Sequence, residues 1–148
     1  MVEIRNQNLL TVDADVICHQ VNCQGVMGSG VAKAIADRWP VVKIVYQVTC
    51  KKFKPEELLG KILPVYVSRK LRVVNIFGQL TYGRDKTKVY TDYAALKRAF
   101  TEIAEVYKGR TIAFPYKFGC GLANGDWNVV YNLIEDYFKN CNVIICKI

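Results

Sequence analysis

The sequence predicts an α/β protein with a mostly parallel central sheet that helices cover on both faces. Strand-like apolar runs alternate with segments of helical periodicity along most of the chain. Two glycine-rich loops each follow a predicted strand directly. The composition, 51% hydrophobic and 23% charged, is that of a globular domain. With 148 residues, we expect one domain over residues 1–148.

The first part of the chain predicts two strands and two helices. Residues 2–5 alternate like an edge or near-edge strand, and residues 16–18 form an apolar run typical of a buried strand. Residues 31–35 place their apolar side chains on one face of a helix. Pro40 ends that helix, because proline disfavours helix before it, and residues 41–52 have the spacing of a second helix.

The middle of the chain predicts a hairpin and a long loop. Residues 55–60 resemble a turn, and residues 61–67 and 71–77 are two β-rich runs around a polar turn. Residues 78–90 have no periodicity. A polar loop of this length in a compact domain is more often functional or mobile than decorative.

The last part predicts a helix, a strand, a helix and a strand. Thr91 is a favourable N-cap, with Asp92 in the first turn, for a long amphipathic helix that ends at Gly109. Residues 111–114 predict a buried strand, and residues 142–147 predict the last one. Between them, apolar residues at helical spacing follow the second glycine-rich loop: Val129, Val130, Leu133, Ile134 and Tyr137.

The two glycine-rich loops indicate a phosphate site. Residues 23–30 connect a strand to a helix N-terminus, where close backbone amides and the helix dipole favour an anion. The glycine spacing is neither the Walker pattern nor the dinucleotide fingerprint, and alone it fits an ordinary turn equally well. Residues 117–125 form a second such loop, which we expect in the same crevice at the carboxyl ends of the strands. Together they favour a diphosphate or phosphorylated ribose as ligand.

The net charge of +8 comes from scattered lysines and arginines, and the densest cluster, residues 51–54, is short. A solvated basic face explains this pattern better than a nucleic-acid groove, and steering of a polyanionic ligand such as a nucleotide is an alternative. No apolar run approaches the roughly 20 residues of a membrane helix, and the start lacks a secretion signal pattern.

Six cysteines without a Cys-x-x-Cys pair, and a single histidine, argue against zinc. Buried free thiols in a reducing cytoplasm explain them better than disulfides do. We therefore expect a cytoplasmic monomer with no metal, no cofactor and no membrane partner.

Three stretches resemble the macro domain, the ADP-ribose-binding three-layer α/β/α fold with a mixed, mostly parallel sheet. They are VNCQGVMGSGVAKAI, YTDYAAL and FPYKFGCGLANGDW, and the resemblance covers nearly the whole chain. The chain looks most like the yeast-type and phage or bacterial ADP-ribose 1''-phosphate phosphatases. The terminal ADP-ribose protein glycohydrolase and the antitoxins of DNA ADP-ribosylation systems are similar as well. The resemblance implies ADP-ribose or ADP-ribose 1''-phosphate as ligand, with nucleic acid only as an ADP-ribosylated substrate.

The resemblance also implies ligand-binding residues. Asn8 replaces an aspartate that contacts adenine in many members, and the Leu9 amide follows it. Asn22 would face the distal ribose. The remaining expected ligand-binding residues come from the strands and loops around the crevice: Gln20, Gly25, Val26, Met27, Gly28, Gly30, Val31, Pro115, Lys117, Phe118, Gly119, Cys120, Gly121 and Leu122.

The resemblance favours a phosphatase over a glycohydrolase. The glycohydrolase subgroup uses a lysine near the end of the central strand and an aspartate after Gly-Cys-Gly-Leu. Here the Gly78–Gln79 region and Ala123 occupy those positions. Cys120 lacks the Cys-x5-Arg cradle of cysteine phosphatases, so we interpret it as a small loop residue.

We expect His19 and Asp85 to be catalytic. His19 lies at the end of the strand that enters the first loop, can titrate near neutral pH, and resembles a histidine implicated in the yeast-type phosphatases. Asp85, in the long loop, is the candidate partner acid. A structural histidine and a solvated loop carboxylate are the alternatives.

The leading hypothesis is a metal-independent phosphatase that converts ADP-ribose 1''-phosphate to ADP-ribose and phosphate by attack of water. The alternatives are a hydrolase or deacylase acting on ADP-ribosylated macromolecules or O-acyl-ADP-ribose, and a reader that binds ADP-ribose without catalysis. A nucleic-acid-binding module would instead show salt-dependent DNA binding that ADP-ribose does not compete with.

Overall fold

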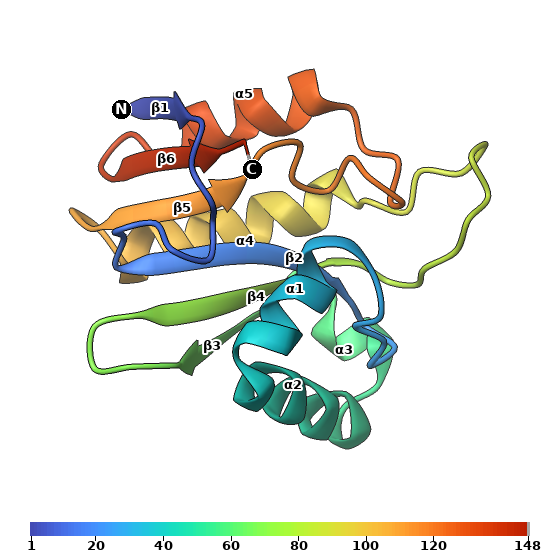
Figure 1. The fold of residues 1–148 in the computed structure, drawn as a ribbon. Helices are drawn as coiled ribbons and strands as arrows, with labels where there is room; N and C mark the ends of the chain where they lie inside the picture. The colour runs from blue at the N-terminus through green and yellow to red at the C-terminus, as the bar shows by residue number, and fades with distance from the viewer. Residues whose placement is uncertain (148) are drawn as a thin grey trace.

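The computed structural model describes residues 1–147 and has three layers, with a six-stranded sheet in the middle (Figure 1). The strand order is β1-β6-β5-β2-β4-β3, and every neighbouring pair is parallel except β3 with β4. The mixed, mostly parallel sheet is thus confirmed. The strands are β1 (Val2–Arg5), β2 (Val16–Asn22), β3 (Ile62–Tyr66), β4 (Arg72–Gln79), β5 (Thr111–Pro115) and β6 (Asn142–Cys146). The helices are α1 (Gly30–Arg38), α2 (Pro40–Lys52), α3 (Pro55–Leu58), α4 (Tyr93–Val106) and α5 (Trp127–Tyr137).

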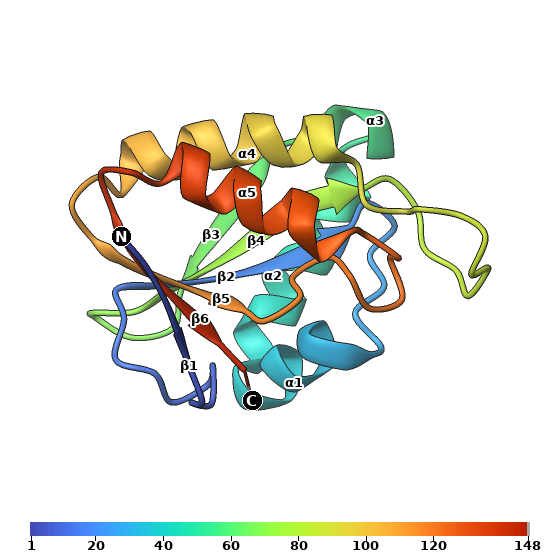
Figure 2. The same ribbon diagram turned by 90° about the horizontal axis from the view of Figure 1, so that it is seen from above.

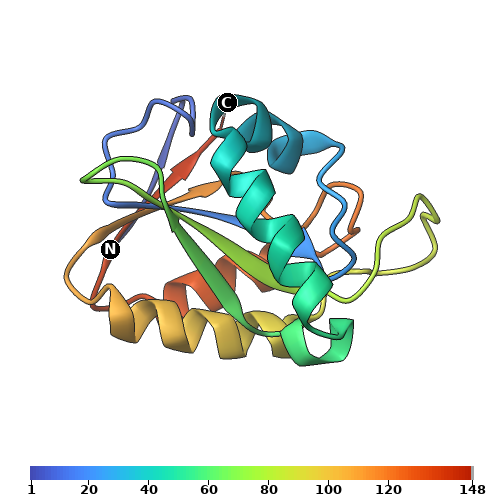
Figure 3. The ribbon, with the colours of Figure 1, turned by 90° about the horizontal axis from the view of Figure 1, so that it is seen from below.

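Helices cover both faces of the sheet. Helices α4 and α5 lie together on one face, and α1 and α2 lie on the other (Figure 2 and Figure 3). Each face has its own hydrophobic cluster. Strand β2 contributes to both, since Val16 and Cys18 pack on the α4 side and Ile17 and Val21 on the α1 side. A strand buried on both faces shows a continuous apolar run rather than alternation, which is the pattern that predicted it.

Several predicted elements are confirmed with small shifts. Strand β1 is an edge strand, as expected, and pairs only with β6. The predicted hairpin is the antiparallel β3–β4 pair. Strand β4 extends to Gln79, into the stretch predicted as loop, because it continues to pair with β2 up to Asn22.

Two local predictions are wrong. Residues 55–60 contain the short helix α3, which starts with Pro55 and is capped where the Glu57 carboxylate accepts from the Lys54 amide at 2.9 Å. The N-cap of α4 is Asp92 rather than Thr91. The Asp92 Oδ1 accepts from the Ala95 amide at 3.0 Å, whereas Thr91 is buried and its hydroxyl donates to the Gly119 carbonyl at 2.6 Å.

The parallel strands bring three loops to one edge of the sheet. Residues 23–29, 80–92 and 116–126 follow β2, β4 and β5 and lie together on the right of Figure 1. Residues 80–92 contact both other loops, because the Tyr90 amide donates to the Ala123 carbonyl at 2.8 Å and the Cys23 amide donates to the Leu80 carbonyl at 3.3 Å. Among residues 1–147, no helix is long and apolar enough to cross a membrane.

Candidate functional site

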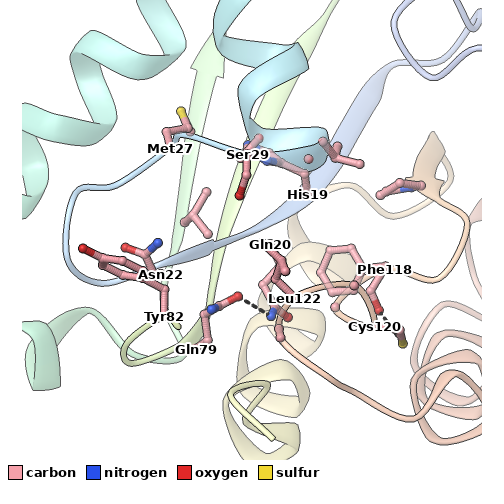
Figure 4. A pocket seen from close by; sticks show the side chains of 18 of the residues that line it. His19, Gln20, Asn22, Met27, Ser29, Gln79, Tyr82, Phe118, Cys120 and Leu122 are labelled. Atoms are coloured by element: carbon pink, nitrogen blue, oxygen red, sulfur yellow. Dashed lines mark hydrogen bonds between the residues drawn. The ribbon is translucent and has the colours of Figure 1, made fainter. Parts of the chain in front are cut away.

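A cavity of about 710 Å³ lies at this edge (Figure 4). Its size is in the range of small-molecule sites. Most of the residues predicted to bind the ligand line it: Gln20, Asn22, Val26, Met27, Gly28, Gly30, Val31, Pro115, Lys117, Phe118, Gly119, Cys120, Gly121 and Leu122. Their contacts with a ligand remain a prediction. His19 lines the cavity as well.

Asn22 holds the first loop in shape. Its Oδ1 accepts from the Gln24 amide at 2.9 Å and the Val26 amide at 3.4 Å, and its Nδ2 donates to the Val26 carbonyl at 2.8 Å. The Tyr46 hydroxyl lies 2.6 Å from the Asn22 carbonyl and 2.9 Å from its Oδ1. The side-chain amide expected to face a ribose is therefore already bonded to the loop, so Asn22 shapes the cavity wall.

The N-terminus of α1 is open to an anion. Ser29 is the N-cap in an extended conformation, but its hydroxyl makes no cap hydrogen bond. The first helical bond runs from the Lys33 amide to the Ser29 carbonyl at 3.3 Å. Within the described part of the chain, the amides of Val31 and Ala32 donate to no protein acceptor, and both residues line the cavity. Such unpaired amides at the positive end of a helix favour a phosphate or carboxylate.

The second loop offers further amides. Gly119 has a φ of +72°, a conformation that residues with a Cβ rarely adopt, so the backbone here favours glycine. Over residues 1–147, the amides of Gly119, Gly121 and Leu122 donate no hydrogen bond within the protein. All three residues line the cavity, and Figure 4 shows Leu122 across the cavity from Met27 and Ser29 of the first loop. Their amides can therefore serve the same anion.

Polar side chains connect β2 and β4 to the second loop at the cavity. The Gln20 Nε2 donates to the Gln79 Oε1 at 2.8 Å and to the Thr91 Oγ1 at 2.9 Å. Thr91 in turn donates to the Gly119 carbonyl. This network fixes the end of β4 against the second loop, and it uses Gln79 at the place where the resemblance implies a lysine in glycohydrolases.

The charged side chains on the cavity wall are both cationic. Arg84 and Lys117 line the cavity, and no aspartate or glutamate among the described residues does so. A cavity with two cations, unpaired amides and no carboxylate favours an anionic ligand.

His19 does not titrate near neutral pH as expected. Its side chain is buried, and its Nε2 lies 2.6 Å from the Asn75 Oδ1. Burial lowers the pKa of His19 to about 4, and the hydrogen bond with Asn75 opposes this only in part. A pKa lowered in this way favours the neutral His19 ring at physiological pH.

Asp85 lies outside the cavity wall. Its Oδ1 accepts from the Thr87 amide at 2.9 Å and from the Thr87 hydroxyl at 2.6 Å, and these hydrogen bonds lower the pKa of the Asp85 carboxyl. An ionised carboxylate engaged in its own turn has no proton to give. The structure does not bring the two expected catalytic residues together on the cavity wall.

Three expected ligand-binding residues also lie outside the lining. The Asn8 Oδ1 accepts from the Leu10 amide at 2.8 Å, and Leu9 is buried in the cluster on the α1 side. Gly25 has a φ of +80°, which allows the first loop to turn at this residue. Its carbonyl accepts a hydrogen bond from the Gln47 Nε2 at 3.2 Å.

The cysteines are consistent with reduced thiols. All six are free. Burial raises the pKa of Cys120 to about 11, so this cavity residue is a thiol rather than a nucleophilic thiolate at neutral pH. No group of three or more His, Cys, Asp or Glu side chains within residues 1–147 could hold a metal ion.

Sequence reasoning missed some of the lining. Ser29, Gln79, Arg84 and Tyr116 line the cavity but were not among the expected site residues. The start of the loop after β4 could have been included, because a strand next to β2 in a parallel sheet ends at the same edge.

The chain belongs to the Macro domain family, whose model matches residues 18–134. A curated relative is the DNA ADP-ribosyl glycohydrolase of Mycobacterium tuberculosis, which is 34% identical over 144 residues and aligns with 94% of this chain and 39% of its own length. An ADP-ribose 1''-phosphate phosphatase of Candida glabrata is 33% identical over 86 residues, covering 53% of this chain and 48% of its own length. The chain thus spans less than half the length of these relatives.

Solved structures confirm the fold. A protein from Bacteroides thetaiotaomicron has a TM-score of 0.87 at 24% identity and covers 100% of both chains. Thermosipho africanus DarTG in complex with ADP-ribose has a TM-score of 0.78 at 21% identity, covering 98% of this chain and 41% of that one. At these identities the likeness establishes the three-layer architecture.

Proposed function

We propose that the cavity binds ADP-ribose and that the chain hydrolyses ADP-ribose 1''-phosphate to ADP-ribose and phosphate. The observation that carries this proposal is the cavity wall, where unpaired amides of the α1 N-terminus and of the second loop lie with two cations and, among residues 1–147, no aspartate or glutamate. A diphosphate between the loops would satisfy both sets of amides. The additional phosphate of ADP-ribose 1''-phosphate would be neutralised by Arg84 and Lys117, which line the same cavity.

The relatives support the ligand class. The printed names of the Mycobacterium and Candida relatives share an ADP-ribosyl or ADP-ribose group. Their common ligand chemistry is that of a nucleoside diphosphate joined to a second ribose. The bound ADP-ribose in the Thermosipho protein supports the same class.

The phosphatase activity would depend on positioning and electrostatic stabilisation. Arg84 and Lys117 would neutralise the charge that develops on the phosphoryl oxygens as water attacks phosphorus and the bond to the anomeric oxygen breaks. Burial raises the pKa of Cys120 and so favours its thiol form, which is why we assign the attack to water rather than to this residue.

Phosphate release from ADP-ribose 1''-phosphate, measured with a chelator present, tests the proposal, and calorimetric titration with ADP-ribose tests the ligand. We expect release and saturable binding of the product. Binding without release would overturn the phosphatase and leave a reader or a different hydrolase. The absence of binding would overturn the ligand assignment.

The second candidate is a DNA ADP-ribosyl glycohydrolase. It is favoured by the Mycobacterium relative, which aligns with nearly the whole chain. Gln79 and Ala123 stand where the resemblance implies the lysine and aspartate of glycohydrolases, which is why we place this activity second. Incubation with an ADP-ribosylated oligonucleotide separates the two, because only the glycohydrolase would restore the unmodified DNA.

A further inference from the structure

One side chain of the second loop bonds to the loop that follows β4. The Asn124 Nδ2 donates to the Lys88 carbonyl at 2.7 Å and to the Asp85 carbonyl at 3.1 Å. A primary amide nitrogen carries two hydrogens, so both are used on the same neighbouring loop. Asn124 does not line the cavity, but it is bonded to the residue next to Arg84, which does.

The second loop fixes the place of Asn124. Its backbone amide donates to the Gly121 carbonyl at 3.0 Å, and its φ of +60° is a left-handed conformation that asparagine tolerates better than most residues. The following amide, of Gly125, donates to the Gly119 carbonyl at 2.9 Å. The Asn124 side chain is thus attached to a turn that is itself hydrogen-bonded.

The segment that Asn124 contacts is folded into a turn around Asp85. The Lys88 amide donates to the Asp85 carbonyl at 3.1 Å, and the Thr87 amide donates to the Asp85 Oδ1 at 2.9 Å. Arg84 immediately precedes this turn. The backbone of Arg84 is therefore held in place to the extent that the turn is.

Among the described residues, this turn has few other contacts with the protein. Figure 2 shows the loop after β4 extending beyond the edge of the sheet. Residues 84–89 are exposed, and none of them belongs to either hydrophobic cluster. Within residues 1–147, the only hydrogen bonds that join residues 84–89 to a part of the chain outside this loop come from Asn124. An exposed segment with so few contacts opens easily when they are removed.

We propose that Asn124 is a positioning residue that fastens residues 85–88 to the second loop and thereby holds Arg84 on the cavity wall for an anionic group of the ligand. This inference rests on the proposed function, because the group concerned is the additional phosphate of ADP-ribose 1''-phosphate. A cation that is already in place spares the ligand the cost of ordering a loose loop on binding.

Hydrogen exchange followed by NMR tests the fastening in the ligand-free protein. Asn124→Gly removes the carboxamide, and glycine adopts a φ of +60° without strain. We expect the amides of Thr87 and Lys88 to exchange roughly tenfold faster in this variant, because the turn opens more often. The amides of β5 should exchange as in the wild type. Unchanged exchange at Thr87 and Lys88 would overturn the proposal.

Asn140→Gly is the matched control. Asn140 is exposed and lies in the turn that precedes β6, at the amino ends of the strands and so away from the cavity. The same substitution there should change neither the exchange of residues 85–88 nor the kinetics of phosphate release.

A double-mutant cycle tests whether Asn124 acts through Arg84. In the wild-type background, Asn124→Gly should lower kcat/KM for ADP-ribose 1''-phosphate roughly twofold to tenfold, the range of a hydrogen bond between neutral groups. In an Arg84→Gln background, the same substitution should change kcat/KM by less than about twofold. A merely structural contribution would lower kcat/KM by the same factor in both backgrounds, and that result would contradict the positioning role.

The two measurements keep this inference separate from the proposed function. If phosphate is not released, the proposed function fails, while the exchange of residues 85–88 in Asn124→Gly still decides whether Asn124 fastens the loop. If phosphate is released and the substitutions of Asn124 and Arg84 act independently, the inference fails alone.

Discussion

Arg84 and Lys117 differ in how the chain holds them. Lys117 has a φ of +57° and begins the second loop next to β5, with its ammonium 5.7 Å from the centre of the Tyr116 ring. Arg84 is on the exposed part of the loop that follows β4. A guanidinium presents several donors in a fixed plane and matches a phosphate better than an ammonium does. If the chain hydrolyses ADP-ribose 1''-phosphate as proposed, we expect Arg84 to contact the terminal phosphate more than Lys117 does.

Replacing Arg84 by glutamine should affect phosphate release more than product binding. A hydrogen bond to a charged group contributes about 1.5–3 kcal/mol, so we expect kcat/KM for ADP-ribose 1''-phosphate to fall roughly tenfold to a hundredfold. The affinity for ADP-ribose, which lacks that phosphate, should change much less. Arg69→Gln, in the exposed β3–β4 turn, should leave both unchanged. An equal loss for both ligands would place Arg84 on the diphosphate instead.

Helix α2 supports the first loop through two side chains, Gln47 on the Gly25 carbonyl and Tyr46 on Asn22. Tyr46 is fully buried, its ring stacks on Phe77 of β4 at a centroid distance of 6.0 Å, and its hydroxyl reaches Asn22. The pKa of Tyr46 is raised, chiefly by burial, which keeps the hydroxyl a donor. The shape of the cavity wall therefore depends on a helix that does not itself line it.

Tyr46→Phe should loosen the first loop. Removing the hydroxyl leaves a buried acceptor on Asn22 without its donor, at a cost of about 1–3 kcal/mol in the free energy of unfolding. Urea denaturation measures this loss, and calorimetry should show weaker ADP-ribose binding. Tyr131→Phe, on a half-buried tyrosine of α5, provides the control. A stability loss with unchanged affinity would show that the loop keeps its shape without this bond.

The excess positive charge of the whole molecule is largely unpaired. Two ion pairs, Arg5 with Glu3 and Lys33 with Asp37, occur within residues 1–147, and both are exposed. The net charge of +8 gives the whole molecule a positive field, and Arg84 and Lys117 contribute to it on the cavity wall. The basic composition is consistent with attraction of a polyanionic small ligand.

ADP-ribose binding should weaken as salt rises, because the Debye length falls from about 10 Å at 0.1 M to about 3 Å at 1 M. The measurement is the Kd by calorimetry across a series of NaCl concentrations. ADP-ribose 1''-phosphate, with its additional phosphate, should show the steeper dependence. Equal slopes would indicate that the field acts on the diphosphate alone. Strong DNA binding that ADP-ribose fails to displace would instead support a separate nucleic-acid surface.

Much of the fold could be predicted from the sequence because its signals are local. The run at residues 16–18 and the spacing along residues 127–137 report burial within a few residues, and strand ends determine where loops gather. Local capping was harder, since Thr91 and Asp92 are both suitable and only the contact with Gly119 shows that Thr91 is used elsewhere.

The chemistry of individual site residues depends on distant parts of the chain. The pKa of His19 is determined by burial and by Asn75, which is 56 residues away in sequence. The sequence does not show that the Asp85 carboxylate accepts a hydrogen bond from the Thr87 amide, so Asp85 was predicted to be free to act as a catalytic acid. Sequence patterns therefore located the cavity wall more successfully than they assigned proton donors.

The open first turn of α1 makes its stability depend on what fills the cavity. An N-cap side chain typically stabilises a helix by about 0.5–2 kcal/mol, and Ser29 leaves that role vacant. A bound anion would complete the helix from outside the chain. The amides of residues 27–33 should then exchange with deuterium more slowly when ligand is present, and the melting temperature should rise with ligand concentration. The bound ligand would then supply the N-cap interaction that the side chain of Ser29 does not make, and α1 would be more stable in the complex than in the free protein.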